Sequence, residues 1–167
     1  MSNLMRYMVL AVAALMLLAC SPPDVASGTS TGQGRTRLNA SAGDAQIGSY
    51  VVRANAMNTV DLTPDIASAY DITRSEDRAL VNLVVLRKDA ASGVAIPVKA
   101  NVSLAAANLT GQVKSVDVFE VIDGDSIYYL SEVAVENRET INFDFDIRPQ
   151  DSDRTLLVRF SHEFYTR

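Results

Sequence analysis

Apolar and polar residues alternate with a period of two along most of the chain, and this pattern restricts the fold more than any other feature of the sequence. Successive side chains of a β-strand point to opposite faces, so alternation predicts a strand with one buried face. The pattern is clearest in the stretch TINFDFDIR, residues 140–148. Its apolar residues share one predicted face: Ile141, Phe143, Phe145 and Ile147. The chain from residue 46 onward is therefore expected to be all-β.

Six further stretches show the same alternation, or a short apolar run bounded by turn residues. The seven predicted strands cover about residues 47–57, 78–88, 96–106, 113–122, 126–136, 140–148 and 155–165. Short connections favour an antiparallel β-sandwich of about seven strands with an immunoglobulin-like topology. The tryptophan and the disulfide of antibody domains are missing, because the chain has no Trp and one Cys. Asp123-Gly124 predicts a hairpin, because both central residues of a type I′ turn need positive φ. The register is left open, since loops of two and of four residues both give sensible facing pairs.

One short helix is predicted between the first two strands, over about residues 64–70. Thr63 is a favourable N-cap, Pro64 fits the first helical position, and Asp65 lies near the positive end of the helix dipole. Three apolar residues share the face that is expected to cover one end of the core: Ile66, Ala67 and Tyr70.

The first 19 residues have the composition of a secretion signal. A short segment with one positive charge precedes an apolar run of 13 residues, Tyr7 to Ala19. This run is shorter than the about 20 residues that a membrane-spanning helix needs. It ends in Leu17-Leu18-Ala19-Cys20, which resembles the lipobox of bacterial lipoproteins, although Leu18 is bulkier than usual. The resemblance implies cleavage before Cys20 and acylation of its thiol.

Lipidation of Cys20 would anchor the protein to a membrane without a spanning helix. Each CH₂ buried in the bilayer contributes roughly 0.8 kcal/mol to membrane binding. Several acyl chains therefore hold a protein stably at a membrane, whereas a single chain does not. The lipoprotein resemblance also implies an outer-membrane location, facing the periplasm, because Ser21 rather than Asp follows the cysteine. Residues 20–45, rich in Ser, Thr, Gly, Ala and Asn, then form a flexible tether, and residues 46–167 form the folded domain.

Further along the chain, three quoted stretches resemble a family of small uncharacterised lipoproteins from Gram-negative bacteria, known only as a domain of unknown function. They are NTVDLTPDIASAYDITRSEDRALVNLVVLRK, AANLTGQ and IYYLSEVAV. The resemblance covers about residues 47–164 and implies a periplasmic β-sandwich behind a lipoprotein signal. It supplies no catalytic residues.

The residues available for catalysis or metal binding are few. His162 is the only histidine, and its position in the alternation places it at the rim of the core. Zinc needs three or four His, Cys or carboxylate ligands, so no metal site and no cofactor are expected. Asp144 and Asp146 would lie about 6.6 Å apart on a strand, near the lower limit for an inverting glycosidase pair. A solvated sheet face explains the same two residues.

The longest interruption of the strand pattern is the best candidate for a contact surface, because loops on a rigid scaffold often carry function. It contains the helix and the charged stretch TRSEDR. The residues predicted to form the surface are Asn58, Thr63, Tyr70, Arg74, Glu76 and Asp77. Tyr128 and Tyr129 would lie on opposite faces of a strand, one in the core and the other suited to an interface.

These features favour a non-enzymatic, membrane-anchored interaction module that binds a periplasmic or outer-membrane protein or peptide. The net charge of −5 argues against a nucleic-acid partner, which calls for a basic patch. Two alternatives remain open: a hydrolase acting on envelope glycan or lipid through Asp144 and Asp146 or His162, and an assembly factor that adds a strand at an exposed edge.

Overall fold

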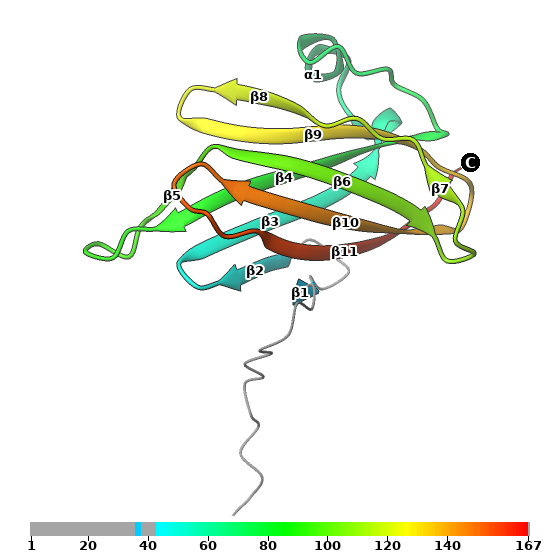
Figure 1. Cartoon of the computed structure of the whole chain (residues 1–167). Coiled ribbons are helices and arrows are strands. Elements are labelled where there is room, and N and C mark those ends of the chain that lie inside the picture. Colours follow the sequence, from blue (N-terminus) through cyan, green and yellow to red (C-terminus); the bar gives the residue numbers. More distant parts are fainter. Residues whose placement is uncertain (1–35, 38–42, 167) are drawn as a thin grey trace, which may run out of the picture. The chain divides into compact units, whose positions relative to one another are not determined.

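The computed structural model describes residues 36–37 and 43–166, which form a β-sandwich (Figure 1). The predicted signal peptide, Cys20 and most of the predicted tether lie outside the described residues. Within the described part of the chain, no helix is long and apolar enough to cross a membrane.

The described residues form eleven strands, one 3-10 helix and one α-helix. The strands of the first sheet are β1 (Thr36–Arg37), β6 (Ala100–Asn108), β7 (Val113–Lys114), β10 (Glu139–Pro149) and β11 (Leu156–Phe164). Those of the second sheet are β2 (Gly43–Ile47), β3 (Tyr50–Asn58), β4 (Arg78–Lys88), β5 (Ala95–Pro97), β8 (Phe119–Asp123) and β9 (Ser126–Ala134). The helices η1 (Thr59–Asp61) and α1 (Pro64–Ala69) lie between β3 and β4.

The order of the longer strands is that of an immunoglobulin constant-type sandwich. In chain order, β3, β4, β6, β8, β9, β10 and β11 correspond to strands A to G. They pair as β3-β4-β9-β8 and β6-β10-β11, which is the arrangement ABED and CFG. Among the described residues, all strand pairs are antiparallel except the short parallel pair of β1 with β11. The predicted all-β, immunoglobulin-like sandwich is therefore confirmed.

The main core lies between the two sheets and follows the predicted alternation. Ile141, Phe143, Phe145 and Ile147 of β10 are at most 2% exposed. Phe143 stacks on Phe160 of the neighbouring strand, with ring centroids 5.9 Å apart, and meets Phe164 edge to face at 6.3 Å. Burying each such side chain stabilises the fold by about 1.5–3 kcal/mol, so the phenylalanines of β10 and β11 anchor the sandwich.

The structure differs from the predicted strands at two places where the chain passes from one sheet to the other. The predicted strand 96–106 is divided into β5, which pairs with β4, and β6, which pairs with β10. The predicted strand 113–122 is divided in the same way, because β7 belongs to the first sheet and β8 to the second. At the start of the domain, β1 and β2 include residues that were assigned to the tether. Alternation reports which face is buried but not which sheet a segment joins.

The hairpin predicted at Asp123-Gly124 is present, but its turn is not type I′. Asp123 pairs with Ser126, so the loop consists of Gly124 and Asp125. Gly124 has φ +56°, whereas Asp125 is not among the residues with positive φ. A single positive φ at the first central position is the pattern of a type II′ turn, which also matches the twist of the strands.

Candidate functional site

The segment between β3 and β4 forms the helical insertion that the sequence predicted. The Thr63 side chain accepts a hydrogen bond from the Ile66 N–H at 3.4 Å, and Pro64 occupies the first turn. The helix ends at Ala69, after which Asp71 adopts φ +54°. These local signals fix where α1 begins and ends.

Helix α1 covers the outer face of the second sheet, not the end of the main core as expected. Ala67 and Ile72 pack with Leu80 of β4 and Leu130 of β9, and form a second, smaller apolar cluster. Ile66 was predicted to face the core but is 47% exposed. The helix is short and turns one narrow apolar face toward the sheet. Ala67 on this face is buried, whereas Ile66 lies at the margin of the smaller apolar cluster.

The six residues predicted to form a contact surface are divided among different roles. Thr63 caps α1. Arg74 donates a hydrogen bond to the Val60 carbonyl at 2.7 Å, and the Asp77 carboxylate accepts one from the Ser75 hydroxyl. These three side chains hold the insertion in place. The remaining three line two separate hollows.

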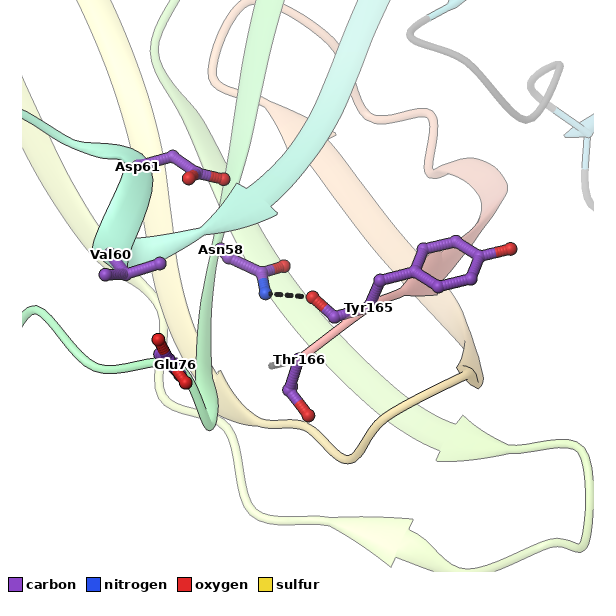
Figure 2. Close-up of a pocket in the computed structure, with 6 residues that line it drawn as sticks. All are labelled: Asn58, Val60, Asp61, Glu76, Tyr165 and Thr166. Carbon is purple, nitrogen blue, oxygen red and sulfur yellow. Dashed lines mark hydrogen bonds between the residues drawn. The ribbon is translucent and has the colours of Figure 1, made fainter.

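Asn58 and Glu76 line the first hollow, a pocket of about 430 Å³ beside the C-terminal end of β11 (Figure 2). Val60, Asp61, Tyr165 and Thr166 complete its lining. The Asn58 amide donates a hydrogen bond to the Tyr165 carbonyl at 2.8 Å, and thereby ties the end of β3 to the residues after β11. The ring of Tyr165 points away from Asn58. The carboxylates of Asp61 and Glu76 give this pocket an acidic lining.

Tyr70 lines the second hollow, an apolar groove of about 200 Å³ on the outer face of the second sheet. The sheet contributes Met57, Leu80, Tyr128 and Leu130, and the helical insertion contributes Leu62, Ile66 and Tyr70. Two polar residues, Asn55 and Asn82, complete the lining. We call this hollow, with these nine residues, the apolar groove. Met57 and Ile66 are 37% and 47% exposed, so its rim offers apolar surface to solvent.

Sequence reasoning found Tyr70 and anticipated Tyr128 but missed the rest of the apolar groove. Tyr129 is buried in the main core, 5% exposed, and Tyr128 lies on the opposite face, as the alternation predicted. The apolar Ile66 in the first turn of the short helix was the local signal in the sequence, but it was predicted to face the core. Apart from Leu62 and Ile66 of the helical insertion, the other lining residues come from three strands that only the sheet brings together.

The Asp144–Asp146 pair lies on the outer face of the first sheet. Asp144 is held by Arg159 of the adjacent strand, whose guanidinium donates two hydrogen bonds to its carboxylate at 2.7 and 2.6 Å. These bonds raise the pKa of Arg159. Asp146 lines a separate polar hollow of about 360 Å³ with Arg148 and Ser103. Asp144 therefore forms an ion pair with Arg159.

His162 and the carboxylates do not assemble into a metal centre in the described residues. The His162 ring lies between two buried rings, 6.1 Å from Phe160 and 4.7 Å from Phe164. Within residues 36–37 and 43–166, no three His, Cys, Asp or Glu side chains are grouped closely enough to hold an ion.

Comparison with known proteins identifies related sequences and folds. The profile of a family described as a domain of unknown function (DUF4426) matches residues 44–167. Comparison with curated proteins gives no match. A DUF4426 family protein from Pseudomonas aeruginosa PAO1 has a similar crystal structure, with a TM-score of 0.64 and 26% sequence identity. That match covers 75% of this chain and 96% of the other.

FetP from uropathogenic Escherichia coli strain F11, recombinantly expressed in the periplasm of E. coli BL21(DE3), shares the fold at 11% identity. Its TM-score is 0.51, and the match covers 76% of this chain and 95% of FetP. A copper-bound FetP variant gives a TM-score of 0.50 at 11% identity, with 76% and 92% of the two chains covered. At this level of identity the likeness shows the fold alone.

Proposed function

Because the chain belongs to the DUF4426 family, whose function is unknown, we propose a role from the features of the chain itself. The protein is a non-enzymatic binding module, held at the periplasmic face of the outer membrane by lipid on Cys20. Its folded domain binds a segment of another envelope protein in the apolar groove.

The anchor is supported by the N-terminal sequence. A positively charged start, a 13-residue apolar run and Ala19-Cys20 occur in the order that a lipoprotein signal requires. Several acyl chains on one residue are enough for stable attachment. The residues that follow are rich in Ser, Gly and Thr and separate the anchor from the first long strand, so the domain can reach a partner in the periplasm.

The apolar groove is the observation that carries the binding role. Seven of its nine lining residues are apolar or aromatic, and none is charged. A partner that covers the exposed rim of Met57 and Ile66 would remove this apolar surface from water, which favours binding, and contiguous apolar patches mark interaction sites. Tyrosine and methionine, which both occur here, are enriched at protein interfaces. The groove therefore offers a partner both area and suitable side chains.

Strand addition at β8 is the second candidate, and one observation favours it. β8 is the last strand of its sheet, with β9 on one side and no strand of the described residues on the other. Ile122 in this strand is 55% exposed. An extended segment could pair with such an edge.

Site-specific photo-crosslinking distinguishes these two surfaces. A benzoyl-phenylalanine residue replaces Ile66 at the rim of the apolar groove, Ile122 in β8, or Val94 in the distant β4–β5 loop as a control of similar exposure, 59%. After irradiation of intact cells, we expect a discrete adduct from position 66 and none from position 94. Adducts from position 122 alone would support strand addition. No adduct above the level of the control from either site would contradict a binding role.

A further inference from the structure

The floor of the apolar groove contains two amide side chains in an otherwise apolar surface. Asn55 on β3 is paired directly with Asn82 on β4, and Asn82 with Leu130 on β9. All three residues line the groove, so their side chains form one row across the sheet. Apolar side chains at these two positions would need no hydrogen-bond partners, whereas each asparagine amide does.

Asn82 is incompletely satisfied. Its Oδ1 atom is shielded from solvent and has no hydrogen-bond partner among the described residues. A buried acceptor without a partner destabilises a fold, and native proteins keep few of them. The side-chain amide carries both a donor and an acceptor, and rotation about its last bond exchanges them in the same space. Asn82 also lines the groove, so this rotation lets either its oxygen or its NH₂ group face a ligand there, while the other group occupies the shielded position.

We propose that the apolar groove binds an extended, uncharged apolar peptide segment whose backbone amide groups hydrogen-bond the side chains of Asn82 and Asn55. This inference rests on the proposed binding role and specifies its ligand. A peptide group is the natural complement of a side-chain amide, because each offers one N–H and one C=O. The apolar side chains of the segment would cover Met57 and Ile66.

The other ligand classes fit less well. An acyl chain would cover the same apolar walls but would offer the amides of Asn55 and Asn82 no hydrogen-bond partner. A charged ligand would lose its hydration against a lining that contains no charged residue. The volume of about 200 Å³ is below the about 300–1,000 Å³ of small-molecule pockets, which favours a few side chains of a larger partner.

The test uses the full chain, reconstituted in phosphatidylcholine vesicles, and the probe peptide acetyl-Leu-Trp-Leu-amide. The chain has no tryptophan, so indole emission reports the peptide alone, and protein-free vesicles give the background. A second peptide carries N-methyl groups on its backbone nitrogens and cannot donate hydrogen bonds. Asn82→Leu removes the amide at similar volume, and Asn101→Leu changes an exposed asparagine of the other sheet as the matched control.

We expect saturable binding to the wild-type chain and to Asn101→Leu, and about tenfold weaker binding to Asn82→Leu, the loss of one hydrogen bond. N-methylation should weaken binding to the wild type about tenfold and cause little further loss in Asn82→Leu. Equal affinity of both peptides for both proteins would overturn the inference, as would the absence of binding. Displacement of the peptide by dodecanoate with equal affinity for wild type and Asn82→Leu would overturn it in favour of an acyl-chain site.

The two proposals fail in different experiments. Crosslinking at Ile66 without peptide binding would leave the binding role intact and remove the peptide chemistry. Peptide binding that depends on Asn82, without any cellular adduct, would leave the chemistry intact and remove the envelope partner.

Discussion

Lys114 and Glu139 form an ion pair in which both side chains are less than a tenth exposed. The Lys114 ammonium lies 2.7 Å from Oε1 and 2.9 Å from Oε2 of Glu139, and their side chains are 9% and 8% exposed. The Glu139 carboxylate also accepts hydrogen bonds from the Asn108 amide and the Glu136 backbone N–H, both at 2.9 Å. The pair therefore joins β7 at the sheet edge to the start of β10 and to the β6–β7 turn.

Glu139→Gln should destabilise the domain. The substitution leaves the Lys114 charge buried without a counter-ion, which typically costs about 3 kcal/mol. Urea denaturation of wild type and variant gives the difference in the free energy of unfolding. Glu136→Gln changes an exposed carboxylate three residues away and should alter stability by no more than about 0.5 kcal/mol. Equal stability of Glu139→Gln and wild type would show that the pair contributes nothing.

Stability should also depend on pH through Glu139. Burial raises the pKa of this carboxyl, but hydrogen bonds from Lys114, Asn108 and the Glu136 backbone outweigh burial and hold the pKa below its ordinary value. A lowered pKa in the folded state means that its contribution is fully present above the unfolded pKa, about 4.5, and is lost as pH falls through the folded pKa. The stability difference between wild type and Glu139→Gln should therefore shrink as pH falls from 7 to 3. A difference that stays constant over this range would refute the assignment.

Tyr129→Phe should cost about 1–3 kcal/mol of unfolding free energy, the penalty for a buried donor without a partner. The Tyr129 hydroxyl accepts a hydrogen bond from the Ala100 N–H at 2.6 Å. Ala100 is the first residue of β6, so this bond connects the second sheet to the first. Burial, the largest cause, raises the pKa of this phenol. Tyr128→Phe, on the opposite face of β9, is the matched control and should be closer to neutral. Thermal unfolding followed by circular dichroism compares the two variants.

Local patterns explain why much of the fold could be predicted. The alternation in β10 placed Ile141, Phe143, Phe145 and Ile147 in the core because a strand has only two faces. Thr63 and Pro64 fixed the start of α1 for equally local reasons. The resemblance to a family of unknown function is confirmed by the DUF4426 match, while the lipoprotein signal remains a prediction.

The crossing between sheets and the apolar groove could not be predicted from local patterns. Lys114 and Phe119 lie in one apparently continuous strand pattern, yet they pair in different sheets. Asn55 and Asn82 face each other only because β3 and β4 adopt one register, and no short-range signal specifies that register across the helical insertion. Sites built from long-range strand pairing are therefore the part of the molecule that requires a structure.

Cys20→Ser should release the protein from the membrane without affecting the folded domain. The substitution removes the thiol that would carry the lipid, so labelled palmitate should no longer be incorporated and the protein should move from the membrane to the soluble fraction. Ser21→Asp keeps the thiol and serves as the matched variant. It should remain palmitoylated but shift toward the inner membrane, as the lipoprotein resemblance implies. Wild-type protein that is soluble and unlabelled would refute the anchor, and with it the location in which a partner is sought.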